Sequence, residues 1–390
     1  MKKIIEYFHL NNIGGLELFF AFFPILSQYN WGRVYGELIA LVIMIIVSVI
    51  KKKHPVPFKP LLIFLIFFII HEIPIVIWYN GNIFGYLQCI ISMVAVFLVV
   101  PALRMDKLIG SIYLVGLISM AGLLYHYLLL LSGNAWDIHP LTLPFLPEFA
   151  SESRAMGIIA RPTSFYWEPA SYVTFMMVPL FFSMLERKYA MSIAIVLFNL
   201  LSGSTNGIAL SFAMLVFYVL TQKVKVYSKI ILVLVGVGLG YFMLNSDLFE
   251  QGVEKLNNTE MDANQRLHNG TALISAMPLE HILFGFPADN VTSYYHSDFR
   301  ISSSSIIPLD ISGNVFVSDL WRVLAKFGIL GYLLYWNIYL WFFRKEKSTR
   351  PYILTLVVGM ISQSLFLGAF FTFQMMVLLI HVNRNKLTVQ

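Results

Sequence analysis

Cysteine and charge are both scarce in this sequence. The single cysteine, Cys89, lies inside an apolar run, so one chain can build neither an internal disulfide nor a thiolate metal site. Charged residues make up only 12% of the 390 positions, against about 25% in a soluble domain. This composition excludes an ordinary soluble domain. The net charge of +6 reflects where the basic residues lie, and we do not interpret it as a sign of nucleic-acid binding.

Several motifs for metal and nucleotide chemistry are also missing. There is no Gly-x-x-x-x-Gly-Lys-Ser/Thr loop, so ATP hydrolysis is not expected. No His-Glu-x-x-His or clustered Asp pattern marks a metal site, and no Asp-x-Asp pair suits a metal-dependent nucleotide-sugar transferase. Any group transfer would therefore use arginine electrostatics and a lipid-linked donor, without a metal or another cofactor.

Apolar residues dominate what remains. They form 58% of the chain, the mean hydropathy is +0.73, and runs of about 17–25 residues recur throughout. The runs are continuous rather than alternating, which favours helices over a transmembrane β-barrel. We predict an all-α, polytopic transmembrane bundle, with residues 1–390 forming a single integral-membrane domain. Twelve helices are expected, or eleven if the last two are one broken helix, near 13–30, 35–50, 60–79, 82–101, 108–131, 169–185, 189–203, 207–221, 228–246, 322–343, 351–367 and 369–382.

The distribution of Lys and Arg predicts the orientation. With both termini in the cytoplasm, 19 of the 27 basic residues lie in cytoplasmic segments, as the positive-inside rule requires. The eight on the outer side are Arg33, Arg154, Arg161, Lys255, Arg266, Arg300, Arg322 and Lys326. Only two loops are long, about 132–168 and 247–321, and both are outside. The second should lie over the bundle with short helices, one near 262–276, and we expect the protein to work at its outer face.

Five ionisable residues fall inside predicted spans, where charge is costly. They are Glu17, Glu37, His71, Glu72 and His126, and all but Glu17 lie in the outer half. They could line a polar cavity open to the outside, or each could hydrogen-bond a neighbouring helix. Pro74 should kink its helix and help to open such a cavity.

The segment from Arg161 to Ser171 leads from the first outer loop into a predicted helix. Pro169 suits a first helical turn, and Glu168 then stands at the helix N-terminus. Glu168 is either a carboxylate favoured by the helix dipole or a group that binds or deprotonates a hydroxyl nucleophile. Arg161 and Arg154 would flank it and offer guanidinium groups to phosphate oxygens, or extend to lipid headgroups.

The second outer loop contributes Arg266, His296 and the start of a helix. Asp319, Arg322 and Lys326 share one face of that helix, so two cations converge near its positive dipole end. The set could hold a diphosphate, or it could be a salt-bridged helix start. His296 alone is an ordinary exposed loop histidine unless a substrate reaches it.

These segments resemble a known family. Arg161-x-x-Ser-Phe-x-x-Glu-Pro-x-Ser171 resembles the motif of bacterial Wzy-type O-antigen and capsule polymerases, which are related to the O-antigen ligases. Leu201–Gly207, Arg266, Leu283-Phe-Gly-Phe286 and Leu324–Gly331 resemble the segments that follow it in that family. The chain departs from the family where Gly313-Asn314 occupies the spacing of a frequent His-Asn pair, with His296 well upstream.

The resemblance implies a metal-independent, inverting glycosyltransferase of GT-C-like fold in the bacterial inner membrane. It would join undecaprenyl-diphosphate-linked oligosaccharide repeat units at the periplasmic face, in lipopolysaccharide or capsule biosynthesis. Arg161 and Arg266 would stabilise the diphosphate, and Glu168 would activate the hydroxyl. Arg154, Arg322, Lys326, His296 and Trp167 are further candidate substrate contacts, and outer-loop aromatic rings, including Trp136, Phe165, Tyr166, Tyr294 and Tyr295, could stack on sugars. Expected partners are these lipid-linked glycans, membrane lipids and a chain-length regulator, with no nucleic acid.

Two other functions fit parts of the pattern. An O-antigen ligase, which moves the finished glycan to lipid A core, has similar loop arginines, but Glu-Pro-Ser favours the polymerase. A flippase for lipid-linked glycans would need a cationic central cavity, whereas here the cations gather at the outer face. A sensor or structural membrane protein would leave that outer charge without a purpose.

Overall fold

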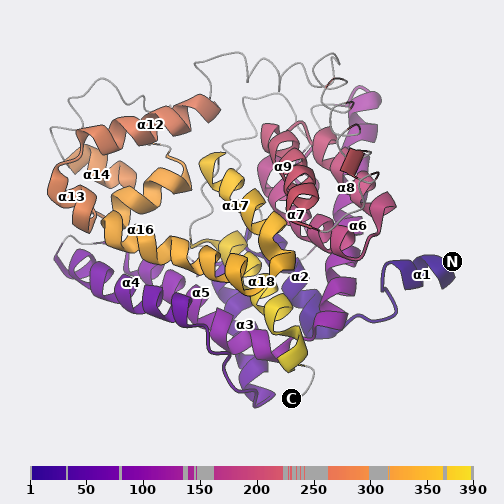
Figure 1. Cartoon of the computed structure of the whole chain (residues 1–390), viewed down its shortest axis with the longest axis horizontal. Coiled ribbons are helices and arrows are strands. Elements are labelled where there is room, and N and C mark those ends of the chain that lie inside the picture. Colours follow the sequence, from indigo (N-terminus) through magenta and orange to yellow (C-terminus); the bar gives the residue numbers. More distant parts are fainter. Residues whose placement is uncertain are drawn as a thin grey trace.

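Figure 1 shows a computed structural model of the chain. Apart from loops and turns, its described residues form helices and one short antiparallel pair, Asn30–Trp31 (β1) with Val34–Tyr35 (β2). The structure describes residues 2–31, 34–78, 81–134, 139–144, 146, 162–222, 227, 229–230, 234, 238, 241, 262–297, 315, 317–362 and 367–387. The all-α prediction is therefore confirmed for these residues.

The helices follow the apolar runs of the sequence. They are α1 (Lys2–Tyr7), α2 (Gly15–Leu26), α3 (Gly36–Ile50), α4 (Lys59–Trp78), α5 (Ile83–Val99), α6 (Met105–Leu131), α7 (Pro169–Leu185), α8 (Tyr189–Leu201), α9 (Thr205–Thr221), α12 (Asp262–Ala276), α13 (Leu279–Phe284), α14 (Val291–Ser297), α16 (Asp319–Lys345), α17 (Arg350–Ser362) and α18 (Ala369–Leu387), with short 3-10 turns at Val100–Ala102 and Lys347–Thr349.

Four of the described helices are long and apolar enough to cross a membrane: α4, α5 with its 3-10 extension, α6 and α16. The helices α2, α3, α7, α8 and α9 are also apolar but shorter, with 10–17 residues each. This composition is in keeping with the predicted membrane protein. In Figure 1, α4, α5 and α16 run side by side and cross the direction of α6.

Several predicted boundaries need correction. The helix expected over 13–30 ends at Leu26, because the chain turns there into the β1–β2 pair. The helix expected over 322–343 runs from Asp319 to Lys345 and is broken at Gly328, whose backbone is left-handed (φ 65°, ψ −174°). The helix expected near 262–276 is confirmed as α12. Most of the helix expected at 228–246 lies outside the described residues.

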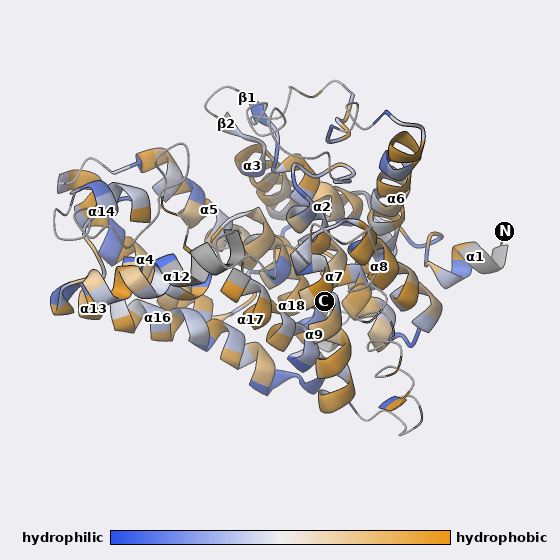
Figure 2. Cartoon of the chain, turned by 90° about the horizontal axis from the view of Figure 1, so that it is seen from above, coloured by the Kyte–Doolittle hydropathy of each residue, from blue (hydrophilic) through white to orange (hydrophobic). Residues whose placement is uncertain are grey.

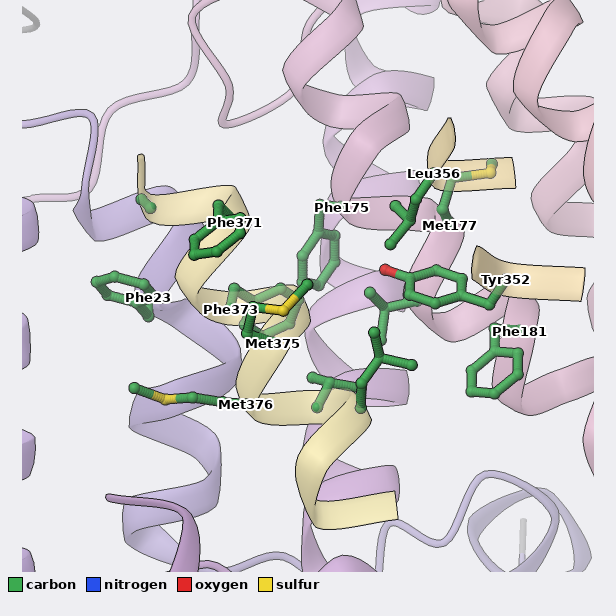
Figure 3. Close-up of a cluster of buried hydrophobic side chains, with 14 of the residues drawn as sticks. Phe23, Phe175, Met177, Phe181, Tyr352, Leu356, Phe371, Phe373, Met375 and Met376 are labelled. Atoms are coloured by element: carbon green, nitrogen blue, oxygen red, sulfur yellow. The ribbon is translucent and has the colours of Figure 1, made fainter. Parts of the chain in front are cut away.

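The centre of the bundle is an apolar core around α18. Figure 3 shows Phe371, Phe373, Met375 and Met376 of α18 between Phe23 of α2 and Phe175 of α7, with Tyr352 of α17 beside them. The rings of Phe175 and Phe373 stack with their centroids 5.8 Å apart. Each of the labelled side chains is at most 4% exposed, so this core holds the N-terminal and C-terminal helices together.

Hydrogen bonds and ion pairs place the basic inter-helix segments together at one end of the bundle, which we call the basic end. Tyr113 of α6 donates a hydrogen bond to Glu186, which pairs with Lys188 after α7. Gln222 after α9 donates to the carbonyl of Lys347 after α16. The opposite end, which we call the loop end, carries residues 162–168 and helices α12–α14, in agreement with the separation of charge that the sequence shows.

Helices α12, α13 and α14 form a small cluster with its own core. Leu273, Met277, Phe286, Tyr294 and Ala325 are buried together, so the cluster shares its core with the first turns of α16. Figures 1 and 2 show the three helices grouped at one side of the molecule, next to α16 and more mixed in hydropathy than α6, α8 and α9. The prediction of short helices in the second long loop is confirmed.

Candidate functional site

The segment 162–168, which carries most of the resemblance, is fixed to the loop end of the bundle through its backbone. The ring Nδ1 of His126 in α6 accepts hydrogen bonds from the backbone N–H groups of Thr163 (3.2 Å) and Ser164 (3.3 Å). A backbone N–H can only donate, so Nδ1 carries no proton and the neutral ring holds its proton on Nε2. His126 is fully buried, and its role is to position this segment.

Two further contacts hold the same segment. The side-chain oxygen of Gln28, just after α2, accepts from the backbone N–H of Trp167 at 2.6 Å. The carbonyl of Ser164 accepts from the N–H of Leu141 at 2.8 Å. Gly122 of α6 permits the close approach, because a Cβ there would lie 2.5 Å from Oγ of Ser164. The segment is thus clamped between α2, α6 and the described part of the first long loop.

Tyr166 anchors the segment from within. Its ring is buried, stacks on Phe175 with centroids 5.7 Å apart, and lies edge-on to Tyr172. Burial raises the pKa of the Tyr166 phenol well above its usual value, and the hydroxyl of Ser119 only partly opposes this. Tyr166 is therefore a neutral packing residue whose ring faces are covered by protein, which leaves it no face to offer to a sugar.

Glu168 stands at the N-cap position of α7, directly before Pro169. Its backbone carbonyl accepts from the N–H groups of Ser171 (3.1 Å) and Tyr172 (3.3 Å), which closes the first turn. Its carboxylate makes no capping hydrogen bond to that turn. The carboxylate lies at the positive end of the helix dipole. Trp167 beside it is 41% exposed.

A second polar cluster joins α4 to α16. Lys326 Nζ lies 3.1 Å from Oε2 of Glu72, and both side chains are less than 10% exposed. The other carboxylate oxygen, Oε1, lies 2.9 Å from Nδ1 of His71, whose Nε2 is 3.0 Å from the carbonyl of Phe284. Glu72 therefore contacts His71 of its own helix and Lys326 of α16, so the cluster links α4 to α16.

The remaining intramembrane carboxylates are also partnered. Glu37 accepts from Gln88 (2.8 Å) and Ser92 (3.1 Å) of α5, and Glu17 accepts from the N–H of Arg104 (2.9 Å). Together with His126 and Glu72, these contacts favour hydrogen bonding between elements over the alternative of a polar cavity. Helix α4 continues as one helix through Pro74.

The structure describes most of the predicted site residues. The positions of Glu168, Trp167 and the buried Lys326 are given above. Arg322 is partly buried one turn before Lys326, and His296 lies on the exposed side of α14. Arg266 belongs to α12, while Arg161, Arg154 and Trp136 lie outside the described residues. Tyr294 and Tyr295 are buried in the core of the α12–α14 cluster, where Tyr294 stacks on Phe286 and is hydrogen-bonded to His281.

Sequence reasoning missed how these residues pair. Glu72 and Lys326 were each singled out, and their opposite charges at membrane positions were the available signal for an ion pair. Gln28 was not singled out, because a glutamine near a predicted helix end has no distinctive pattern. Within the described residues, no group of three or more His, Cys, Asp or Glu side chains is arranged to hold a metal ion.

Comparison with known proteins adds no family assignment. No protein-family model matches the sequence, and no curated protein matches it.

Proposed function

We propose that this protein is a polysaccharide polymerase of the Wzy type, which joins undecaprenyl-diphosphate-linked repeat units at the outer face of a bacterial inner membrane. In this proposal the loop end faces the periplasm, both termini are cytoplasmic, and twelve helices form a GT-C-like bundle. The reaction uses no metal ion.

One observation carries the proposal. Glu168 ends a segment whose backbone N–H groups at Thr163, Ser164 and Trp167 donate hydrogen bonds to side chains of α6 and of the residues just after α2. Catalytic groups need a fixed position, and a loop clamped onto rigid helices provides it. A carboxylate held at the loop end is where a general base for an outer-face reaction would be needed.

The proposed step is a displacement at the anomeric carbon of the growing chain. A sugar hydroxyl of the incoming unit forms the new C–O bond while its proton passes to Glu168. The bond from the anomeric carbon to the lipid diphosphate breaks with inversion, and the diphosphate leaves with both electrons. Arg161 and Arg266 stabilise its negative charge, with Arg154, Arg322 and His296 as further contacts. We leave Lys326 out of the substrate site, because its ammonium is buried against Glu72.

The test is deletion of the gene followed by gel analysis of the surface glycolipid. Plasmids would restore wild type, Arg161→Ala or Glu168→Gln, each with an epitope tag to measure protein level. Deletion should collapse the ladder to core plus one repeat unit, because export and ligation survive. Wild type should restore the ladder, and both variants should fail at normal protein level, since a general base contributes about 10²–10⁴-fold to rate.

Two matched controls make the same substitutions, Arg to Ala and Glu to Gln, at exposed positions outside the proposed site. Arg344→Ala, exposed at the basic end, and Glu280→Gln, exposed on α13, should both restore the full ladder. Loss of every band above bare core on deletion would overturn the polymerase proposal. Accumulation of polymer on undecaprenyl diphosphate would then identify a ligase, and its absence would favour a flippase.

A further inference from the structure

The segment from α13 to Ala288 reaches down beside α4 instead of staying above the bundle. His71, whose ring contacts the carbonyl of Phe284, lies seven residues before the end of α4 at Trp78. At 1.5 Å per residue this is about 10 Å along the helix from its loop end. Helix α4 has 20 residues, about 30 Å of helix, so all of it is needed to cross the hydrocarbon core of a bilayer.

Backbone groups of this segment form hydrogen bonds with α4, with α16 and within α13. The carbonyl of Phe284 faces Nε2 of His71, and the carbonyl of Ala288 accepts from the ammonium of Lys326. The N–H of Phe286 donates to the carbonyl of Ala325 at 3.1 Å, and that of Gly285 donates to His281 at 2.8 Å. Irregular backbone at membrane depth is tolerated only when its polar groups find partners within the protein, and this segment meets that condition at these four groups.

Two glycines make the close approach possible. A Cβ on Gly285 would lie 2.2 Å from the carbonyl oxygen of Lys326, and one on Gly328 would lie 2.3 Å from that of Leu283. Both residues have positive φ, 88° and 65°. The break in α16 at Gly328 therefore coincides with the place where α13 ends against it, so the break and the descending segment form one feature.

Helix α13 turns apolar side chains outward at this level. Leu279 is 68%, Leu283 39% and Phe284 73% exposed. The two helices that α13 contacts also have exposed apolar residues close to the contact points: Ile70 and Ile73 flank His71 and Glu72 on α4, and Ile329 and Leu330 follow Gly328 on α16. The exposed apolar side chains of α13 thus lie at the level of exposed apolar residues on two helices long enough to cross a membrane.

We propose that α13 and the turn after it form a membrane-inserted element, with Leu279, Leu283 and Phe284 in contact with the acyl chains of the bilayer leaflet at the loop end. The occupant is lipid rather than a protein, because α13 ends against α4 and α16, two helices that are long and apolar enough to cross a membrane and that carry exposed apolar residues at the same level. Its anchor is the cluster of His71, Glu72 and Lys326. The consequence is that the α12–α14 cluster is held at the membrane surface and cannot lift from it as a free loop. This proposal does not depend on the proposed enzymatic function.

Spin labelling of the full chain in vesicles tests this directly. Cys89→Ser removes the only native cysteine, and single cysteines are then introduced at Phe284, at Leu279 and, as controls, at Ile70 and Ser293. Ile70 is exposed on α4 and Ser293 is exposed on α14. After reconstitution in phosphatidylcholine and phosphatidylglycerol, collision of each label with oxygen and with a water-soluble nickel chelate is measured.

The label at Phe284 should resemble the label at Ile70, with an oxygen-to-nickel collision ratio several-fold higher than that at Ser293. The label at Leu279 should give a ratio between the two, since it lies at the other end of α13. A nickel accessibility at both α13 positions equal to that at Ser293 would place α13 in water and overturn the proposal. Protection from both reagents would also overturn it and indicate a second copy or a protein partner. The two independent α13 positions cover the case in which one variant does not fold.

Discussion

Two segments lie against the loop end of the bundle, and their backbones are held by opposite chemistry. In residues 162–168, the neutral side chains of His126 and Gln28 accept hydrogen bonds from backbone N–H groups. In the segment 284–288, the side chains of His71 and Lys326 donate hydrogen bonds to backbone carbonyls. The first segment is held without charge, whereas the second depends on a buried carboxylate, Glu72, that keeps its donors in place. The second should therefore be far more sensitive to loss of a single partner.

Lys326→Met gives the largest expected effect. It leaves Glu72 charged and buried without its ammonium partner, and breaking a buried pair in this way costs about 3–5 kcal/mol. Replacing both residues, with Glu72→Leu and Lys326→Met together, should cost less than the single change, because no unpaired charge remains. Unfolding of the purified protein in detergent measures both. A double variant as unstable as Lys326→Met would show that the pair is not the source of the loss.

Gly328→Ala should come next, at about 3 kcal/mol, from backbone strain together with the clash against the Leu283 carbonyl. Gly133→Ala is the matched control, since Gly133 also has positive φ, 80°, but nothing lies within 4 Å of the added Cβ. The difference in unfolding free energy between the two variants measures the part of the loss that comes from the clash with the Leu283 carbonyl. Equal losses would mean that strain alone accounts for the effect and that the approach is not tight.

The neutral anchors of residues 162–168 should give the smallest effects. His126→Leu removes the acceptor of two buried N–H groups and should cost about 2 kcal/mol, while Gln28→Ala removes the acceptor of one N–H group and should cost about 1 kcal/mol. If these anchors position Glu168, both variants should also shorten the polymer ladder in the order of their unfolding losses. If His126→Leu is destabilised but still gives a full ladder, the hydrogen bonds of His126 are not needed for activity.

Most of the helices could be predicted from the sequence, because long apolar runs indicate membrane-spanning helices. Helix α12 was also predicted, near 262–276 in the second long loop, and is confirmed. The break at Gly328 was not, since Leu324–Gly331 reads as ordinary helix, and the reason for the break is a carbonyl from Leu283 that only the fold brings there. Local sequence cannot report a contact made by a distant segment.

The candidate site divides in the same way. The position of Glu168 at the start of α7 followed from Pro169 and is confirmed. The opposite charges of Glu72 and Lys326 allow an ion pair, but the sequence does not show that these two residues meet. The helical spacing of Asp319, Arg322 and Lys326 describes one face of α16 and says nothing of what packs against that face. The charge of Lys326 looked available for a phosphate only because its partner was unknown.

The contact between His71 and Phe284 joins residues 213 positions apart, and it imposes an order on biosynthesis. A ribosome releases α4 long before it has made α13 or α16, so His71 and Glu72 enter the bilayer ahead of the carbonyl and the ammonium that later satisfy them. Nascent chains consequently pass through a stage with an unfinished polar site in lipid. A chain that stops before α16 lacks Lys326 and therefore keeps Glu72 without its ammonium partner.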